Sequence, residues 1–226
     1  FAYSNANYNL LGLVIEAASG ETYADYVQKH IFAPLDMRHT YTSAAEAQGH
    51  GPAVGHRYWF AAPRPQSKLR TPPGSLAAGA LISCVEDMAR YLIAHLDGGR
   101  CAGAQILSAA GIAELQRGAA DFPMWGFGTR QYGMGWFVEQ IGGERFVWHS
   151  GTTHDFAAHM ALLPDQGRGF VLLMNANHHM MVPVFIELGM GVTALLAGLE
   201  PGASPLHMGA WVPWLLRGLL LLPALP

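Results

Sequence analysis

The sequence predicts an α+β fold in which an antiparallel β-sheet is flanked by helices. Three observations lead to this class: helical periodicity with capping residues near the start, a change to strand-like alternation at Tyr132, and an apolar helical stretch from about Val182. The 226-residue chain is 51% hydrophobic and 13% charged, which is enough apolar surface for a core.

Two consecutive helices are predicted at the start of the chain. Asn7 to Ser19 has helical periodicity, and Gly20 suits the left-handed residue that ends a helix. Thr22 can cap a second helix to about Phe32, which Pro34 prevents from continuing. The apolar face of the first helix comprises Leu10, Leu11, Val14, Ile15 and Ala18.

The next region is predicted to be mostly surface loop. Residues 43–80 are rich in Ala, Gly, Pro and Gln, with at most a short strand around residues 56–60. Ser83 and Glu86 have capping-box spacing for a helix that ends at Gly98-Gly99. Ser108 can cap a further helix to about Arg117.

Two strand-turn-strand units follow. Met134, Trp136 and Val138 alternate along one strand, and a Gly-Gly turn at 142–143 leads to a returning strand at 145–149. Residues 154–163 and 168–175 form the second pair around a turn at 164–167. An apolar helix is expected from 182 to about 199.

Charge and cysteine content exclude some classes of protein. Thirteen Lys and Arg against sixteen Asp and Glu give a net charge of −3 with no basic run, so a nucleic-acid partner is not expected. Cys84 and Cys101 form neither a disulfide framework nor a metal-type spacing, which leaves the compartment open.

The end of the chain has a different character. Residues 211–223 are apolar but interrupted by Arg217 and prolines, and they are shorter than the roughly 20 residues that span a bilayer. We expect residues 1–200 to belong to one domain and residues 201–226 to be an apolar tail. Two alternatives stay open for the tail: a loosely packed or interfacial segment, with membrane contact through 211–226, or the start of a membrane helix.

Two short motifs could carry chemistry. Tyr3-Ser4-Asn5 lies directly before the first helix, and His149-Ser150-Gly151 ends a strand before Thr152-Thr153. Each alone is typical of an ordinary turn. Further motifs occur at residues 32–37, 78–91 and 132–136. As an ordered set, from Phe1 to about Asn177, they resemble the serine β-lactamase and penicillin-binding protein superfamily, most closely its class C-like branch.

The resemblance implies a β-lactamase/transpeptidase-like fold that is incomplete at its N-terminus, and it implies roles for both motifs. Tyr3 would shuttle protons beside a serine nucleophile, and Asn5 would hydrogen-bond the substrate amide and a catalytic lysine. A free tyrosine has a pKa of about 10, so Tyr3 could act as a base only near a cation.

The second motif would bind substrate. His149 stands where many relatives have Lys, and it could donate a hydrogen bond to a substrate carboxylate or assist Tyr3. Ser150 would offer its hydroxyl to that carboxylate, and Gly151 would allow close approach to the strand. The Thr152 backbone N–H would be one oxyanion donor. The histidine favours peptidase or esterase activity over efficient β-lactam hydrolysis.

The chain departs from the family pattern in one respect. The family's nucleophile lies in Ser-x-x-Lys, upstream of the tyrosine motif. The only lysines here are Lys29 and Lys68, each preceded three residues earlier by Tyr26 or Pro65, so the motif is absent. We therefore expect the C-terminal portion of a serine hydrolase acting on an amide, ester or β-lactam, inactive by itself. The alternative is a non-catalytic penicillin-binding-like receptor or scaffold module.

Other site hypotheses are weaker. Ser150 lacks the glycine pattern of a nucleophile elbow, and adjacent strand residues point apart, so His149 is poorly placed as its base. The histidines lack zinc-site spacing and are expected to be exposed or half-buried. The histidines considered are His154, His159, His178 and His179.

Further expectations concern packing, partners and location. Asp155 could pair with His149 or His154, and Trp125 and Trp136 are expected in the core rather than in a pocket. No metal or organic cofactor is expected, and the partner would be a small-molecule or peptide substrate. The family resemblance implies a periplasmic or other extracytoplasmic location, with or without a membrane anchor. Substrate identity and oligomeric state stay open.

Overall fold

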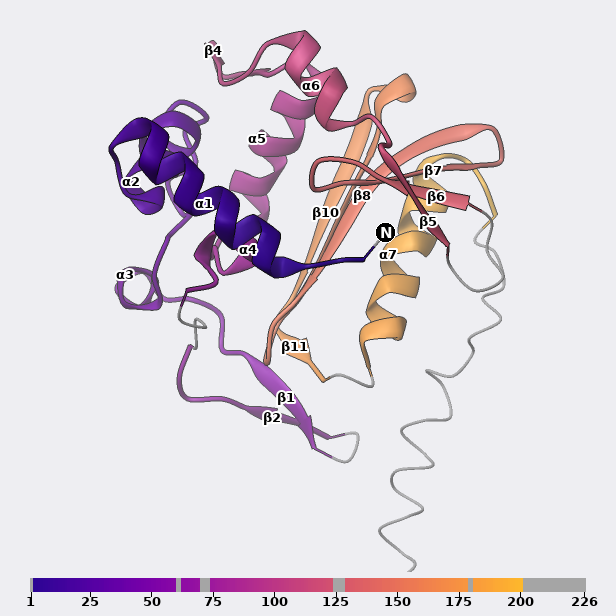
Figure 1. The fold of residues 1–226 in the computed structure, drawn as a ribbon. Coiled ribbons are helices and arrows are strands. Elements are labelled where there is room, and N and C mark those ends of the chain that lie inside the picture. Colours follow the sequence, from indigo (N-terminus) through magenta and orange to yellow (C-terminus); the bar gives the residue numbers. More distant parts are fainter. Residues whose placement is uncertain (1, 60–61, 70–73, 124–128, 179–180, 201–226) are drawn as a thin grey trace, which may run out of the picture. The chain divides into compact units, whose positions relative to one another are not determined.

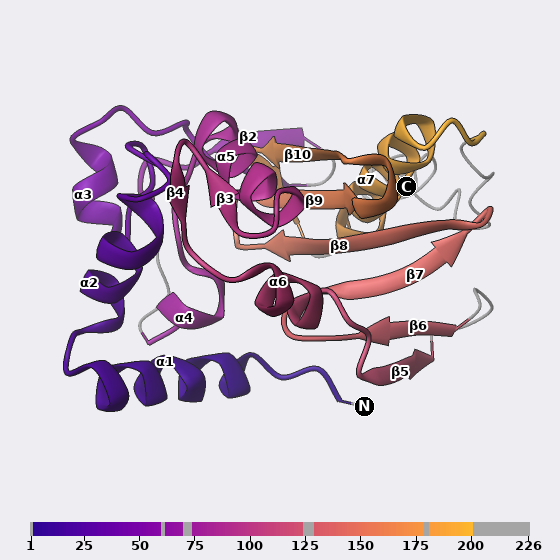
Figure 2. The same cartoon turned by 90° about the horizontal axis from the view of Figure 1, so that it is seen from above.

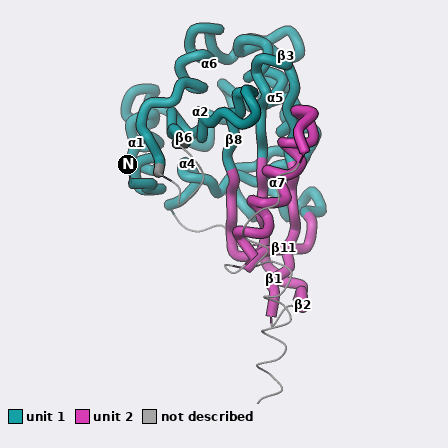
Figure 3. Tube along the Cα trace, turned by 90° about the vertical axis from the view of Figure 1, so that its right-hand side faces the viewer, with its two compact units in different colours: residues 1–52, 70–149, 160–171 teal, residues 53–69, 150–159, 172–226 magenta. Residues whose placement is uncertain are grey.

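The computed structural model describes residues 2–59, 62–69, 74–123, 129–178 and 181–200. It contains the predicted combination of helices and an antiparallel sheet (Figures 1 and 2). The chain divides into two compact units (Figure 3). Unit 1 comprises residues 1–52, 70–149 and 160–171, and unit 2 comprises residues 53–69, 150–159 and 172–226.

Unit 1 contains most of the helices. Its longest are α1 (Asn5–Ser19) and α5 (Val85–Leu96). The shorter helices are α2 (Tyr23–Val27), the π-helix η1 (Gln28–Phe32), α3 (Ala44–Gln48), α4 (Leu76–Gly79) and α6 (Ala109–Leu115). A small hairpin of β3 (Arg100–Cys101) and β4 (Ala104–Gln105) follows α5.

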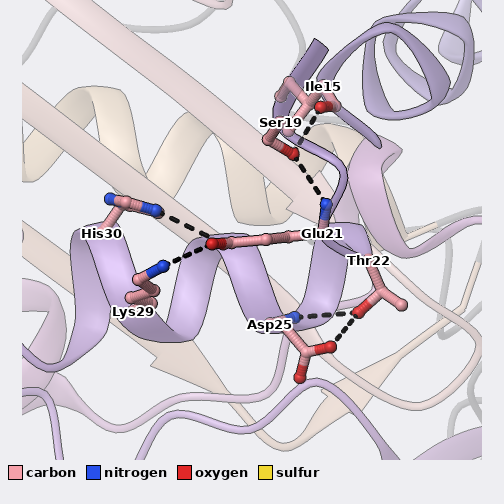
Figure 4. A network of polar contacts seen from close by, with 7 residues as sticks. All are labelled: Ile15, Ser19, Glu21, Thr22, Asp25, Lys29 and His30. Carbon is pink, nitrogen blue, oxygen red and sulfur yellow. Dashed lines mark hydrogen bonds and ion pairs between the residues drawn. The ribbon is translucent and has the colours of Figure 1, made fainter. Parts of the chain in front are cut away.

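Local capping sets the corner between α1 and α2, as predicted. Gly20 has φ 72° and donates its N–H to the Glu16 carbonyl, which ends α1. The Thr22 hydroxyl accepts from the Asp25 N–H at 3.1 Å. Figure 4 shows how the Glu21 carboxylate joins this corner to η1 through ion pairs with Lys29 and His30. The predicted Ser108 cap of α6 is also present.

The predicted capping box of α5 is wrong. The cap position is Cys84, without a side-chain cap, and the Ser83 hydroxyl lies 2.8 Å from the Thr40 hydroxyl. Asp87, 2% exposed, accepts from the His39 N–H at 2.7 Å and the Thr40 hydroxyl at 2.8 Å. Long-range partners thus replace the local cap, because the α5 terminus is packed against residues 39–40 instead of facing water.

The apolar face predicted for α1 is mostly exposed. Leu10 is 61% and Leu11 and Val14 are each 53% exposed. The buried residue of α1 is Gly12, where a Cβ would lie 2.7 Å from the Ala77 Cβ. Helix α4 therefore approaches the α1 backbone at a glycine and not at the leucine stripe.

The main sheet has six strands in the order β10-β9-β8-β7-β6-β5. Strands β5 to β8 pair antiparallel in sequence order. The strands are β5 (Ala120–Pro123), β6 (Thr129–Tyr132), β7 (Phe137–Ile141), β8 (Glu144–Thr152), β9 (Ala157–Leu163) and β10 (Arg168–Met174). The 3₁₀ turn Pro164–Gln166 joins the last two.

The predicted strand through Met134 and Trp136 is a turn. Both residues lie between β6 and β7, where the Gly133 N–H bonds the Trp136 carbonyl at 2.8 Å. Gly135 has φ 84°, which glycine adopts without strain. Trp136 is 3% exposed, so its predicted place in the core is confirmed, while Trp125 lies outside the described residues.

Two apolar clusters form the core of unit 1. One gathers Val27, Phe32, Leu35, Met37 and Ala94 from the helical region. The other joins α5 to the sheet through Leu92, Trp136, Val147 and Leu162. The two clusters hold the helices to one another and to the central strands.

Unit 2 contains a second, three-stranded sheet in the order β11-β1-β2. Strand β1 (His56–Trp59) pairs antiparallel with β2 (Ala62–Pro65) and parallel with β11 (Ala176–Asn177). Residues 43–80 therefore contain a hairpin and two short helices, more structure than predicted. Their many prolines are compatible with this because β2 lies at the sheet edge.

Helix α7 (Val182–Leu196) packs closely on a histidine within unit 2. A Cβ at Gly189 would lie 2.3 Å from the His159 Cγ, and His159 is 1% exposed. The Thr193 hydroxyl, also buried, donates to the Gly189 carbonyl at 2.8 Å. Among the described residues, no helix combines the length and apolar character needed to cross a membrane. The predicted tail, residues 201–226, lies outside the described residues.

A buried charge cluster braces the sheet. Arg130 on β6 pairs with Glu139 on β7 at 2.5 Å, with side chains 10% and 6% exposed. The Trp148 indole N–H donates to the Glu139 carboxylate at 2.7 Å. The Arg130 guanidinium lies 5.4 Å from the Trp148 ring centre, within cation–π range.

We predict that Glu139→Gln destabilises the chain by about 3 kcal/mol, because it removes the negative charge that balances the buried Arg130 guanidinium. The matched control is Glu114→Gln, which removes the exposed pair with Arg117 and should change the stability little. Urea denaturation of both variants measures the difference. Equal stabilities would contradict the structural role of the buried pair.

Gly189→Ala should destabilise by about 2 kcal/mol, since the new methyl group would overlap the immobile His159 ring. Gly191→Ala on the same helix is the control. A Cβ there meets nothing within 4 Å, so higher helix propensity should stabilise it by about 0.5 kcal/mol. Thermal melts of the two variants should therefore shift in opposite directions, and parallel shifts would refute the close packing.

Because the His95 imidazole is buried, we predict that the folded chain loses stability in acid. Its burial between Tyr91 and Trp136 lowers its pKa to about 4 from the ordinary value of 6.5. The unfolded chain therefore binds a proton that the folded chain rejects, so stability is full above pH 6.5 and declines by about 3 kcal/mol as the pH falls towards 4. Denaturation between pH 7 and 4 should show a shallower decline for His95→Leu. Tyr91→Phe, which alters the same pocket without removing the imidazole, should retain the full decline.

Candidate active site

Tyr3 lies immediately before the N-cap of α1. Ser4 is extended, with φ −146° and ψ 115°, and caps the helix by backbone position alone. The segment before α1 runs beside strands β5 and β6 (Figures 1 and 2). Tyr3 itself is 45% exposed. The ring of Tyr3 packs edge-on against that of Tyr132 at the end of β6, 5.8 Å apart. Tyr3 is therefore anchored on the sheet and still open to solvent.

The structure brings Tyr3 and His149 together. The Tyr3 hydroxyl lies 3.5 Å from His149 Nε2, at the long end of hydrogen-bonding range, although 146 residues separate them. His149 follows three buried residues of β8 and lies beside Phe137, with ring centres 5.4 Å apart. Tyr3 of the first motif and His149 of the second therefore lie together in unit 1. Their catalytic roles stay predictions.

A second tyrosine pair supports this site. The hydroxyls of Tyr8 on α1 and Tyr132 on β6 lie 2.6 Å apart. Tyr132 stands in the motif at residues 132–136, and Tyr8 lies three residues after the Tyr3-Ser4-Asn5 motif; no role was predicted for either. Gly133, where a Cβ would lie 2.3 Å from the Arg117 carbonyl oxygen, shows that the turn after Tyr132 is tightly packed. The Tyr-Gly-Met-Gly-Trp motif at residues 132–136 was the signal in the sequence that could have pointed to Tyr132.

The surroundings of the phenols favour their neutral forms. Burial and the nearby Tyr8 raise the pKa of Tyr3, while a side-chain hydrogen bond with Tyr132 acts in the opposite direction. Burial, followed by contacts with Tyr8 and Tyr3, raises the pKa of Tyr132 far above its usual value. Tyr3 is thus a phenol at neutral pH in this environment. Base catalysis by Tyr3 would need a cation close by.

Ser150 makes a contact that was not predicted. Its hydroxyl lies 2.8 Å from Nδ1 of His159 on β9, inside unit 2. His159 is nearly fully buried, so the expectation of an exposed or half-buried residue is wrong. The ring is covered by the glycine face of α7, a tertiary feature that no local pattern in β9 reveals. A serine–histidine pair does exist, but its histidine is His159 and not the neighbouring His149.

The remaining predicted residues are accessible. Gly151 and Thr152 are exposed at the end of β8, and Asn5 is exposed at the start of α1. A Cβ at Gly151 would meet only the Ala158 Cβ, at 4.0 Å. Internal packing therefore does not require glycine at this position. The structure shows no contact between Asn5 and a substrate group, and the roles of all three residues stay predictions.

The loop after β8 is fixed within unit 2. The Thr153 N–H donates to the Phe156 carbonyl at 2.9 Å, and the Asn177 side-chain amide donates to the Thr153 carbonyl. Asp155, 5% exposed, pairs with Arg57 at 2.8 Å. The two partners proposed for Asp155, His149 and His154, are therefore replaced by an arginine from β1. Among the described residues, no three His, Cys, Asp or Glu side chains converge as a metal site would require.

Comparison with known proteins finds relatives of this chain. The Beta-lactamase family model matches residues 1–184. Protein flp of Staphylococcus aureus strain MW2 is 27% identical over 190 residues, which are 83% of this chain and 35% of that protein. Penicillin-binding protein 4 of Amycolatopsis lactamdurans is 26% identical over 203 residues, 88% of this chain and 53% of that protein.

Solved structures show the same fold. The octameric penicillin-binding protein homologue from Pyrococcus abyssi has a TM-score of 0.77 and 29% identity, over 89% of this chain and 43% of that one. A class C beta-lactamase has a TM-score of 0.69 at 19% identity, over 88% of this chain and 57% of that one, which bears on the fold alone. This chain thus spans between about a third and somewhat over half of these proteins. With a family match over residues 1–184 and Tyr3 in contact with His149, the chain belongs to the beta-lactamase family of the serine β-lactamase and penicillin-binding protein superfamily.

Proposed function

We propose that this chain supplies the tyrosine and histidine side of the active site of an acyl-serine hydrolase. Its nucleophile would come from a Ser-x-x-Lys segment that is not among these 226 residues. The observation that carries the proposal is the Tyr3–His149 contact, 3.5 Å between side chains that are 146 positions apart in the chain. A contact between these motif residues is what a shared catalytic site requires and what two unrelated turns would not produce.

The chemistry follows from the groups present. The serine oxygen would attack the carbonyl carbon of an amide, ester or β-lactam, and its proton would pass to Tyr3. The carbonyl oxygen would gain negative charge, to be stabilised by backbone donors that include Thr152 N–H. Tyr3 would then return the proton to the leaving nitrogen or oxygen as that bond breaks. Water would then attack the acyl-serine, giving a proton to Tyr3, and Tyr3 would return a proton to the serine oxygen as the acyl group leaves.

The raised pKa of Tyr3 supports a dependence on the absent segment. Burial disfavours the phenolate, so the lysine of Ser-x-x-Lys would supply the positive charge that lowers this pKa. His149 would bind a substrate carboxylate or assist Tyr3. Gly151 supports substrate binding along β8, because the described residues leave the space beside it unfilled.

Substrate class and location are also proposals. With His149 in place of lysine, we favour a peptide or ester over a β-lactam as the preferred substrate. Members of the family are typically extracytoplasmic, and we propose the same location for this protein.

The decisive test adds the in-frame sequence upstream of Phe1. We expect Ser-x-x-Lys there, and the extended protein should be acylated by a fluorescent penicillin and turn over a p-nitrophenyl ester or a D-Ala-D-Ala peptide. Tyr3→Phe should lower kcat by about 10²–10⁴, the contribution of a general acid–base group. Tyr26→Phe, in a ring contact with His30 on the helical side of unit 1, is the control and should retain activity.

Two outcomes would overturn the proposal. The first is an extended sequence without Ser-x-x-Lys, which would favour the non-catalytic receptor or scaffold. The second is labelling of the 226-residue chain alone by a fluorophosphonate that disappears in Ser150→Ala. That result would make Ser150 and His159 the catalytic pair, since they are already 2.8 Å apart.

A further inference from the structure

Three phenols and one imidazole form a cluster contributed by the segment before α1, by α1 itself and by strands β6 and β8. The Tyr8 and Tyr132 hydroxyls are 2.6 Å apart, and the Tyr3 hydroxyl is 3.5 Å from His149 Nε2. Tyr132 lies between the two pairs. Its ring centre is 5.8 Å from that of Tyr3 and 6.2 Å from that of His149. The Tyr3 and His149 ring centres are 6.1 Å apart, so these three rings form a triangle, and Tyr8 contacts it through the Tyr132 hydroxyl.

We infer that Tyr132 is a positioning residue for Tyr3: it donates a hydrogen bond to the Tyr3 oxygen, while Tyr8 donates to Tyr132. This inference deepens the proposed function and rests on it, because it concerns the group proposed to carry the serine proton.

The direction of the hydrogen bonds between the phenols follows from counting their protons. Each phenol has one proton to donate, so Tyr132 can donate to only one of its two phenol neighbours. If Tyr8 donates to Tyr132, the Tyr132 proton is available to Tyr3. A Tyr3 oxygen that has lost its proton can only accept hydrogen bonds, so this direction is the one compatible with Tyr3 acting as a base.

Burial of Tyr132 strengthens the hydrogen bond that its hydroxyl donates. Tyr132 is 8% exposed, so water competes weakly for its hydroxyl, whereas Tyr3 is 45% exposed and can meet a substrate. The Phe137 ring, 4.9 Å away edge-on, limits the movement of the Tyr132 ring. The raised pKa of Tyr132 keeps its hydroxyl protonated, and therefore able to donate, at neutral pH. In the part of the chain that the structure describes, the titratable side chains facing Tyr3 are Tyr8, Tyr132 and His149.

The inference is tested on the 226-residue chain by NMR titration of ¹³Cζ-labelled tyrosines, with Tyr3→Phe used to assign the Tyr3 signal. Tyr132→Phe should raise the pKa of Tyr3 by about one unit, the effect of losing one hydrogen bond to a phenolate. Tyr58→Phe in unit 2 is the control and should leave the Tyr3 titration unchanged. An unchanged or lowered Tyr3 pKa in Tyr132→Phe would overturn the inference.

A second variant distinguishes the loss of this hydrogen bond from a folding defect. Replacing Tyr132 with 3-fluorotyrosine preserves its shape and makes its hydroxyl a stronger donor, so the pKa of Tyr3 should fall. No change would count against the inference just as clearly. Neither titration requires a nucleophile, so both can succeed even if the extended protein shows no acylation. In an active extended protein, Tyr132→Phe should lower kcat with little change in KM and shift the rising limb of the pH–kcat profile to higher pH.

Discussion

The site depends on the burial of strand β8. Phe146 and Val147 are fully buried and Trp148 is 3% exposed, so a slip of β8 by one residue would turn this apolar run towards the wrong faces. The Trp148 indole is further fixed by its bond to Glu139, whose charge is balanced by Arg130. His149 comes next in the strand. Its position beside Tyr3 therefore follows from the core packing of the three residues that precede it.

The electrostatics of the site are unusual for a proton-transfer group. A tyrosine that accepts a proton must spend part of the reaction as a phenolate, but burial and Tyr8 oppose that form of Tyr3. Two features can compensate: a cation contributed by a Ser-x-x-Lys segment, and a hydrogen bond from Tyr132. The first is Coulombic and acts only when that segment is present. The second is built into β6 and acts in the chain by itself, which allows the two to be measured separately.

Several elements were predictable because their causes are local. The end of α1 at Gly20 and the caps at Thr22 and Ser108 follow from single residues acting on adjacent backbone. The hairpin at Gly142-Gly143 and the turn into β10 were also recognisable from composition. Predictions failed where a distant partner intervened. Ser83 bonds Thr40 instead of capping α5, Met134 and Trp136 form a turn, and the leucine face of α1 stays exposed because α4 approaches at Gly12.

The sequence by itself determined the family, the α+β class and the residues of the two motifs, since these depend on residue types in a fixed order. It also determined that no Ser-x-x-Lys is present. Only the tertiary structure decided which groups touch: Tyr3 with His149, Tyr8 with Tyr132, Ser150 with His159 and Asp155 with Arg57. The physical reason is that such contacts depend on strand register and on the close approach of backbones at Gly12 and Gly189, and both are set by the packing of segments far apart in the chain.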